Sequence, residues 1–395
     1  MKITGCILAK DEENTIGACI TNLATVADEI VVIDNGSSDN TIEVAQKMGC
    51  VVQSCANKTF DRARNAYHDV ATGDWILSLD VDERIDPSSI DYLKDVLESS
   101  KDYMAFRLPR YDYIGNGKWA LIDLCRLYKN DPQIGYDNLS MHASIAPALQ
   151  KINGKAKSIE FALHHYDAFF EQERLYAKRV RNITNTLAEL EELPKDSKYV
   201  YFLRSFLGLE YAALGRFDDA ENEYREAMKF DRNYRNYAQL YLAQNYRLMG
   251  EYDRAKAEAL KLVETDDSLM LRAMVIIADI DLYEGRREQA YLSVKKIYEK
   301  ENRLAANLIN MVEFLYQESP TEATQFISEA IKINPLLLSA DIYREGGEYS
   351  TFKQQSSFLH NTKTIFYYLG EMAKSGCEDA KRVQESVNDY KAVNW

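Results

Sequence analysis

The chain has 395 residues, of which 46% are hydrophobic and 28% are charged, and its formal net charge at pH 7 is −14. This length predicts two or three domains, and the composition is that of a globular protein rather than a disordered one. Because contacts to phosphate groups need clustered Lys and Arg, the negative charge argues against binding to nucleic acid or to anionic membranes.

The cysteines and the hydropathy of the chain indicate its compartment. The six cysteines contain no Cys-x-x-Cys pair and are accompanied by only five histidines, which favours reduced thiols over a disulfide framework or a zinc site. No stretch approaches the roughly 18 apolar residues of a membrane span, and the apolar run near Met1 is too short for a signal peptide. We therefore expect a soluble, cytoplasmic protein without a membrane span.

The first 80 residues alternate between strand-like and helix-like patterns. We predict strands at 3–9, 30–33, 51–54 and 75–79, and helices at 14–26, 39–48 and 61–71. This alternation with short loops is typical of a mostly parallel, Rossmann-like α/β sheet with right-handed crossovers. Ligands of such sheets bind beyond the carboxyl ends of the strands, so the loops after the first, second and fourth strands should form the site.

The pattern between residues 100 and 165 is weaker. Short apolar runs predict strands at 104–108, 125–128 and 159–163, separated by turns that contain Gly, Asn or Pro. We assign these strands to the same domain, which should span residues 1–170.

After Phe169 the sequence changes to long helical patterns with an internal repeat. Gly215, Gly250 and Gly285 recur every 35 residues, and an alanine follows each of them by five residues. This period predicts tetratricopeptide repeats, which are helical hairpins that bury their apolar faces only by stacking on one another. We predict a helical linker at 171–198, an all-α repeat solenoid at 199–335 and a C-terminal helical cap at 336–395.

Four carboxylates follow the strand at 75–79, namely Asp80, Asp82, Glu83 and Asp86. Asp86 precedes Pro-Ser-Ser and is best explained as a helix cap. Asp80 and Asp82 flank a single residue, so their charges repel, and Mg²⁺ or Mn²⁺ together with phosphate oxygens would relieve this repulsion. A solvated turn is the alternative, since acidic residues are common after strands. The pattern favours a metal and diphosphate site.

Other loops at this edge could bind the rest of a nucleotide. Asp34 directly follows the second strand and could accept hydrogen bonds from a ribose or a base. Arg64 and Asn65 lie on the first turn of the third helix, where they could meet phosphate or base; an exposed helix arginine is the competing interpretation. The chain lacks G-x-G-x-x-G and G-x-x-x-x-G-K-[ST], which disfavours a dinucleotide cofactor and a P-loop enzyme.

Taken together, these motifs resemble a family 2 glycosyltransferase with the GT-A fold. The resemblance rests on CILAKDEENTI, DEIVVIDNGSSDNT, ARN followed by ATGDWILSLDVDE, and CRLYK leading to IGYDNLSMH. With the repeats behind them, the chain resembles more closely a bacterial subgroup with C-terminal tetratricopeptide repeats. That subgroup includes peptide glycosyltransferases that modify bacteriocins and enzymes of cell-surface glycan synthesis. The resemblance implies a nucleotide-diphosphate sugar donor, often a UDP-sugar, and a peptide, protein or glycan acceptor.

The resemblance also implies roles for single residues in binding the donor. Asp11 or Glu12 would hold the uridine together with Asp34. Arg64 and Asn65 would help to hold the nucleotide.

For the sugar and the metal, the resemblance implies that Asp80 contacts the ribose or the sugar and that Asp82 binds Mg²⁺ or Mn²⁺. A histidine after the last strand commonly completes the metal shell in this family, and the spacing favours His165 over His164. A histidine pair at a domain junction is the alternative.

Three positions depart from the family pattern. Lys10 and Asp11 stand where an aromatic residue and Asn are usual, Ala143 follows His142 where an acidic residue is common, and Asp167 stands two residues after His165 where a glycine is usual. By resemblance we expect inversion at the anomeric carbon, with His142 or Glu83 as the base that takes the proton of the acceptor. A cysteine acceptor would make this base nearly dispensable, because a thiolate is already nucleophilic.

Three functions remain in competition. The first is a sugar transferase whose repeats bind the acceptor or a protein partner. The second is a sugar nucleotidyltransferase, which usually has a Gly-rich loop after its first strand that AKDEENTIGA lacks. The third is a repeat scaffold with a vestigial sugar site. We also consider a homodimer.

Overall fold

The computed structural model describes residues 1–55, 61–86, 89–137, 143–229, 232–265 and 267–388. The chain divides into two compact units. The sheet unit contains residues 1–112 and 121–167, and the helical unit contains residues 113–120 and the described residues from 168 onwards. The predicted domain 1–170 therefore differs from the sheet unit mainly at 113–120, which the structure groups with the helices.

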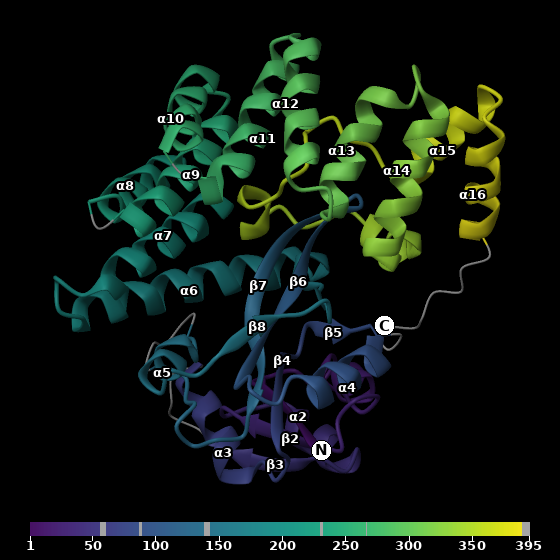
Figure 1. Cartoon of the computed structure of the whole chain (residues 1–395). Coiled ribbons are helices and arrows are strands. Elements are labelled where there is room, and N and C mark those ends of the chain that lie inside the picture. Colours follow the sequence, from purple (N-terminus) through teal and green to yellow (C-terminus); the bar gives the residue numbers. More distant parts are fainter. Residues whose placement is uncertain (56–60, 87–88, 138–142, 230–231, 266, 389–395) are drawn as a thin grey trace. The chain divides into compact units, whose positions relative to one another are not determined.

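Nine strands, counted over the described residues, form one mixed sheet with the order β3-β2-β1-β4-β7-β6-β9-β5, and β8 pairs with β6 (Figure 1). The strands are β1 (Ile3–Ala9), β2 (Glu29–Asp34), β3 (Val51–Ser54), β4 (Trp75–Asp80), β5 (Glu83–Ile85), β6 (Ala105–Gly115), β7 (Lys118–Lys129), β8 (Ala156–Ser158) and β9 (Leu163–His165). The first four strands are parallel, whereas β7 runs antiparallel to β4 and β5 antiparallel to β9. The predicted mostly parallel α/β sheet is confirmed.

Helices cover both faces of this sheet. One apolar core lies between the strands and α1 (Ile16–Leu23), α2 (Thr41–Lys47) and α4 (Ile90–Ser99). A second core lies on the opposite face, against η1 (Asp61–Ala66), α3 (Tyr67–Val70) and α5 (Ala146–Lys151). Because neighbouring residues of a strand point to opposite faces, Ile7 of β1 belongs to the first core and Leu8 to the second.

Two predicted elements of the sheet unit differ from the structure. The strand predicted at 159–163 is wrong, since Ile159 and Phe161 are buried between β8 and β9 without lying in either strand. Alternating apolar residues there fill the core while the chain leaves the sheet, which periodicity alone cannot distinguish from a strand. The helix predicted at 61–71 is a 3-10 segment followed by one short α-helical turn.

The helical unit contains the predicted helical repeats. Its helices are α6 (Gln172–Glu192), α7 (Lys198–Ala213), α8 (Phe217–Ala227), α9 (Arg232–Met249), α10 (Tyr252–Thr265), α11 (Asp267–Tyr283), α12 (Arg287–Lys300), α13 (Ala305–Leu315), α14 (Pro320–Ile333), α15 (Ile365–Lys374) and α16 (Glu378–Asn388). From α7 to α14 consecutive helices pack as hairpins. Gly215, Gly250 and Gly285 end a first helix at φ values of +72°, +77° and +76°, a conformation that favours glycine.

The prediction of helices throughout 336–395 is wrong for its first half. Short 3-10 turns, η4 (Pro335–Leu338), η5 (Ala340–Tyr343) and η6 (Thr351–Gln354), alternate there with extended chain before α15 begins. The backbone N–H groups of Leu359 and His360 donate to the side chains of Asn310 and Asp279, and not to carbonyls of a helix of their own. Among the described helices, none combines the length and the apolar character that crossing a membrane requires.

Candidate functional site

Polar residues follow the strands at the predicted edge of the sheet. In the register of the parallel strands, Ala9 at the end of β1 pairs with Asp34 of β2, and Leu8 pairs with Asp80 of β4. Asp34 and Asp80 therefore flank the end of β1, from which the loop of Asp11 and Glu12 departs.

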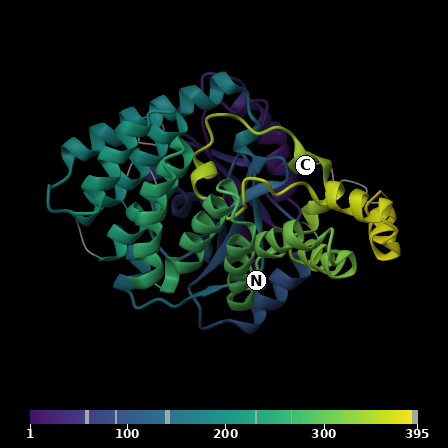
Figure 2. The same ribbon diagram turned by 90° about the horizontal axis from the view of Figure 1, so that it is seen from above.

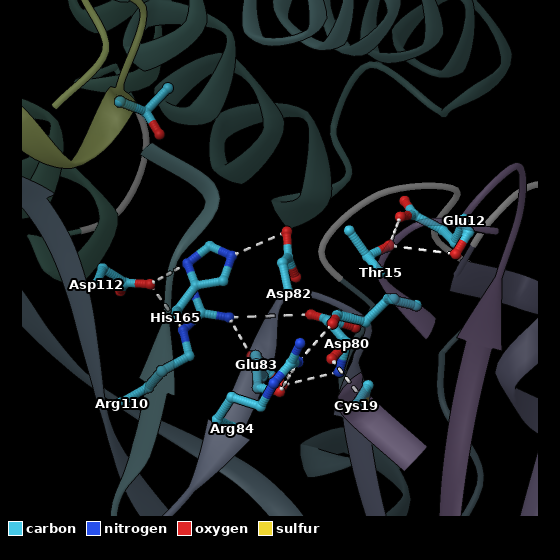
Figure 3. Close-up of polar contacts among 12 residues, drawn as sticks. Glu12, Thr15, Cys19, Asp80, Asp82, Glu83, Arg84, Arg110, Asp112 and His165 are labelled. Carbon is cyan, nitrogen blue, oxygen red and sulfur yellow. Dashed lines mark hydrogen bonds and ion pairs between the residues drawn. The ribbon is translucent and has the colours of Figure 1, made fainter. Parts of the chain in front are cut away.

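Asp82, His165 and Asp167 form a candidate metal-binding triad. One ligand atom from each residue lies within 4.8 Å of the other two, and His165 Nε2 lies 3.3 Å from Asp82 Oδ2 (Figure 3). The antiparallel pairing of β5 with β9 places His165 opposite Glu83, next to the turn that carries Asp82. His165 and Asp167 are buried and Asp82 is partly exposed, so the triad is open to a ligand through Asp82.

This donor set fits a divalent cation. Two carboxylates and one imidazole bind such ions at about 2.0–2.6 Å, so one ion can bridge ligand atoms that are less than 4.8 Å apart. A metal-bound histidine must be neutral, and its other ring nitrogen is usually held by a carboxylate or a carbonyl.

Asp112 is that carboxylate for His165. Its Oδ1 lies 2.7 Å from His165 Nδ1, and Asp112 is fully buried on β6 (Figure 3). Burial alone would lower the pKa of His165, but the Asp82 and Asp112 carboxylates raise it to about 10, so His165 would have to release its proton in order to bind a metal ion. The Asp112 contact leaves Nε2 directed at Asp82, which is the orientation that a ligand of the same ion needs.

Asp80 is held by two arginines. Arg64 Nη2 lies 2.5 Å from Asp80 Oδ1, and Arg126 Nη2 lies 2.5 Å from Asp80 Oδ2. Burial alone would raise the pKa of Asp80, but Arg126 and Arg64 together hold it well below its ordinary value. Asp80 is therefore an anion, and the two guanidinium groups fix its side chain at the edge of the sheet where β1, β2 and β4 end, here called the rim.

Glu83 lies beneath this rim. It is fully buried, its Oε1 accepts from Arg110 at 2.7 Å and from Arg126 at 3.2 Å, and its Oε2 accepts from the backbone N–H of Asp80 at 2.9 Å. A carboxylate that is enclosed by two arginines and sealed from solvent has no free oxygen for an acceptor hydroxyl. This geometry disfavours Glu83 as the base and gives it the role of bracing the arginines.

Hydrogen bonds to backbone carbonyls stabilise the turn between β4 and β5. Arg84 Nη1 donates to the carbonyls of Val81 and Glu83, both at 2.7 Å, and Arg84 is buried. The backbone N–H of Tyr166 donates to the carbonyl of Asp82 at 3.1 Å. Asp82 is thus held by a hydrogen bond to its own carbonyl and by contacts to the carbonyls of the residues on either side of it.

The residues predicted to bind uridine make hydrogen bonds within and between the loops of the rim. Asp34 is almost fully buried and accepts from the N–H groups of Gly36 at 3.0 Å and Ser37 at 3.2 Å. Asp11 Oδ1 accepts from the backbone N–H and the hydroxyl of Ser38. Glu12 contacts the Thr15 hydroxyl. In this conformation Asp11 links the first two loops of the rim.

The predicted helix residues Arg64 and Asn65 have different environments. Arg64 is buried and points at Asp80. Asn65 Nδ2 donates to the Tyr136 carbonyl at 3.1 Å, and its Oδ1 accepts from the Tyr136 N–H at 2.7 Å. The Asn65 amide therefore fastens the neighbouring loop.

The other two histidines considered for the site are His164 and His142. His164 stacks on Tyr111 at 5.5 Å between ring centroids, and burial lowers its pKa to about 4. The structure thus places His165, and not His164, beside Asp82. His142 lies outside the described residues.

Four residues of the site were not among the site residues predicted from the sequence, namely Arg110, Asp112, Arg126 and Asp167. Arg126 lies inside the CRLYK motif, and Asp167 replaces the usual glycine of the family pattern. Both could have been found from these motifs. Arg110 and Asp112 lie on a long strand with no sequence signal, and only pairing with β9 brings Asp112 opposite His165.

Part of the sheet unit is similar to known proteins. Residues 5–155 match the family model for glycosyl transferase family 2. Residues 5–155 form a family 2 glycosyltransferase domain. The glycosyltransferase domain includes β1 to β7, with Asp34, Asp80 and Asp82, whereas His165 and Asp167 follow the matched range.

The curated relatives resemble parts of the chain. A TPR repeat-containing protein of Synechococcus elongatus is 28% identical over 239 residues, which cover 58% of this chain and 57% of that protein. An uncharacterized glycosyltransferase of Rickettsia conorii is 25% identical over 27% of this chain and 39% of that protein. The lipopolysaccharide core biosynthesis glycosyltransferase LpsC of Rhizobium meliloti is 25% identical over 29% and 44%. The chain thus spans 39% to 57% of the length of these relatives.

Among solved structures, part of the chain is similar to glucosyl-3-phosphoglycerate synthase from Mycobacterium tuberculosis. The complex of that enzyme with Mn²⁺, UDP-glucose and phosphoglyceric acid is 22% identical, has a TM-score of 0.25, and covers 28% of this chain and 44% of the other. The complex with phosphoglyceric acid has a TM-score of 0.32 at 15% identity and covers 42% and 72%. Both overlaps are partial, so the assignment of the domain rests on the family model.

Proposed function

We propose that this chain transfers a sugar from a nucleotide-diphosphate sugar, a UDP-sugar, to a peptide, protein or glycan acceptor, with inversion and with Mg²⁺ or Mn²⁺. The observation that carries the proposal is the triad of Asp82, His165 and Asp167 beside Asp80, at the strand ends of a family 2 glycosyltransferase domain. Acidic residues that converge where a donor diphosphate would lie need a cation between them and that diphosphate.

The triad residues would hold the cation, which supplies charge stabilisation for the departing nucleoside diphosphate. Asp80 would contact the ribose or the sugar. Arg64 and Arg126 keep Asp80 ionised and fixed, so its hydrogen-bond acceptors are oriented before the donor arrives. Such preorganisation is the usual source of electrostatic catalysis.

The rest of the donor site would come from the two loops of the rim. Asp34, with Asp11 or Glu12, would hold the uridine, and Arg64 with Asn65 would help to position the nucleotide. Asp11 and Asn65 would have to exchange loop contacts for ligand contacts, because both are engaged within the loops.

For the base we favour His142 over Glu83, because the oxygens of Glu83 are committed to Arg110, Arg126 and a backbone N–H. The helical unit would bind the acceptor or a protein partner. The six free cysteines fit a reducing compartment such as the cytoplasm.

The proposal is tested by nucleotide-sugar turnover. A mass-spectrometric screen of nucleotide sugars, with and without Mn²⁺, should find one donor that is hydrolysed or transferred only with the metal. Asp82→Ala should lower this turnover by more than about 100-fold with folding intact, whereas Asp95→Ala, an exposed aspartate of α4, should leave it unchanged. Full activity of Asp82→Ala would refute the proposal.

The same screen separates the two alternatives. Pyrophosphate released from a sugar phosphate and a nucleoside triphosphate would indicate a sugar nucleotidyltransferase. The lack of any donor-dependent thermal shift in the presence of Mn²⁺ would indicate a repeat scaffold with a vestigial sugar site.

A further inference from the structure

Residues 344–363, here called the strap, contain one short 3-10 helix, η6, but no α-helix or strand, and they run along the repeats of the helical unit. Figure 2 shows them as part of the yellow-green trace between α14 and α15. Near the start of the strap, the N–H of Glu348 donates to the Gln172 side chain at 2.9 Å, and Arg179 Nη1 donates to the Thr351 hydroxyl at 3.3 Å. Both partners belong to α6.

The middle of the strap contacts the first repeat. Gln354 is 1% exposed; it accepts from the Tyr224 hydroxyl at 2.8 Å and donates to the Leu209 carbonyl at 3.4 Å. The short helix η6, which ends at Gln354, also packs on α7 and α9. A glutamine side chain of the strap thus satisfies buried groups of two helices.

Asn310 of α13 binds the last third of the strap. Its Nδ2 donates to the Ser357 carbonyl at 2.8 Å, and its Oδ1 accepts from the Leu359 N–H at 3.2 Å and from the Thr362 hydroxyl at 3.1 Å. Asn310 is 1% exposed and Leu359 is fully buried. One side chain therefore holds three positions of the strap, two of them through the backbone.

Asp279 of α11 binds the strap at His360. Asp279 Oδ1 accepts from the His360 N–H at 2.5 Å and lies 2.8 Å from His360 Nδ1, while Oδ2 pairs with Arg247 at 2.6 Å. The His360 ring stacks on Tyr283 with ring centroids 3.6 Å apart. His360 is therefore held by both its backbone and its ring.

The strap follows one face of the solenoid. Leu209 and Asp279 each lie six residues before the glycine that ends a first helix, Gly215 and Gly285, so they occupy the same position in two repeats. Asn310 lies on the first helix of the next hairpin. The strap therefore crosses the first helices of successive repeats, and we call this surface the inner face.

The turn between β6 and β7 fastens the beginning of the strap. The N–H of Asn116 donates to the Arg344 carbonyl at 3.0 Å, and the N–H of Gly117 donates to the Ile342 carbonyl at 2.9 Å. A Cβ atom added to Gly115 would lie 2.2 Å from the backbone nitrogen of Gly346. Only two glycines allow the backbones to cross this closely.

The first two residues of β7 contact the end of the strap. Lys118 Nζ donates to the carbonyls of Leu359 at 2.9 Å and His360 at 3.0 Å. The Trp119 ring packs edge-on against Phe358, with 4.7 Å between ring centroids. The strap is thus held between the turn at 113–120 and the repeats, all within the helical unit.

We propose that the strap is a resident peptide ligand of the inner face of the repeats, which it closes to other peptides. A partner or an acceptor peptide must then dock on another surface of the helical unit. The contacts are those of peptide recognition: polar side chains of the face bind backbone groups, while buried side chains of the ligand fix its register. This inference does not depend on the transferase activity.

The energetics favour a closed face over a displaceable strap. Release of the strap would deprive three buried side chains of the repeats, those of Asn310, Asp279 and Tyr224, of the hydrogen bonds that they make to it. A buried polar group that loses its partner destabilises the protein by more than an average hydrogen bond contributes. An external peptide would have to restore all of these contacts in the same register.

Hydrogen exchange of the full chain tests the proposal. The amides of Leu359 and His360 should exchange as slowly as those of α11 and α13, because the strap opens only when the repeats open. Exchange of these two amides at least 100-fold faster than the helices would show local opening of the strap and would overturn the proposal.

Two asparagines of α13 provide a matched pair of variants. Asn310→Ala removes three contacts with the strap and should raise the exchange rate of residues 357–362 by about 100-fold. Asn307→Ala removes a buried amide that donates to the Glu301 carbonyl and not to the strap, so it should leave the strap protected. Equal exchange of the strap in both variants would contradict the inference.

A variant of the strap itself covers the case in which Asn310→Ala does not fold. Gln354→Ala with Leu359→Ala weakens the strap and leaves the inner face intact. A labelled synthetic peptide with the sequence of residues 344–363 should bind this variant at least 10-fold more tightly than the native chain. Equal affinity for the native chain would show that the face is open and would overturn the proposal.

Discussion

The carboxylate of Asp112 should determine how well the triad binds a metal, although it is not a ligand itself. Asp112→Asn keeps the size of the side chain and removes its charge. The amide oxygen can still accept the hydrogen bond of His165 Nδ1, which Asp112 Oδ1 now accepts at 2.7 Å. What is lost is the charge that makes His165 a stronger ligand.

The size of the effect follows from the position of Asp112. Outer carboxylates that hold a metal-bound histidine contribute 10- to 100-fold to metal affinity, or about 1.4–2.7 kcal/mol. Because Asp112 is fully buried and also lies 2.8 Å from Arg110 Nε, the substitution leaves a buried cation with one anionic partner fewer. We expect a further loss of about 3 kcal/mol in the free energy of unfolding.

Calorimetric titration with Mn²⁺ measures the first effect and urea unfolding the second. Asp279→Asn is the matched control, because Asp279 is a buried aspartate that contacts a histidine, His360, and an arginine, Arg247, yet contacts no residue of the triad. It should destabilise the helical unit without changing Mn²⁺ affinity. If folded Asp112→Asn binds Mn²⁺ within twofold of the native chain, the reasoning about His165 is wrong.

Two further predictions concern the stability of each unit. In urea unfolding, Gly208→Ala should destabilise the helical unit by about 1–3 kcal/mol, because the added Cβ would lie 2.4 Å from the Tyr224 ring. The control, Gly370→Ala, adds a Cβ that meets nothing closer than 4.0 Å and should stabilise the unit by about 0.4–1 kcal/mol. Equal effects of the two substitutions would refute the packing argument. For Glu29, burial alone would raise the pKa, but hydrogen bonds from Thr4, Thr72 and Lys2 lower it to about 2, below its ordinary value of 4.5. The carboxylate therefore stabilises the fold at pH values above 4.5. Glu29→Gln should lower the free energy of unfolding by about 1–3 kcal/mol at pH 7, and this loss should shrink as the pH falls from 4.5 towards 2. A loss that does not change with pH would contradict this reasoning.

Much of the sheet could be predicted because its signals are local. Buried strands and amphipathic helices have periods that show in short windows, and parallel strands bring their carboxyl ends to one edge by necessity. That is why the sequence alone assigns Asp34, Asp80 and Asp82 to one edge. The repeats could be predicted for the same reason, since Gly215, Gly250 and Gly285 occur at a constant spacing.

The candidate site could be predicted only where its residues follow such strands. Glu83 follows Asp82 directly and shares its sequence signal, but it points into the sheet towards Arg110 and Arg126. In a strand, neighbouring side chains point to opposite faces, and the tertiary contacts of each face decide which carboxylate reaches solvent. Asp167 lies close to Asp82 only because β9 pairs with β5.

The sequence by itself determined the mostly parallel sheet, the acidic edge at its strand ends and the helical hairpins that follow, since each depends on residues close together in the chain. Only the tertiary structure decided the support of His165 by Asp112, the burial of Glu83, and the course of residues 344–363 along the repeats. These features join segments that are tens to hundreds of residues apart, such as Arg179 with Thr351. Such pairings leave no periodic pattern, because they depend on which buried polar groups find a partner once the elements have packed.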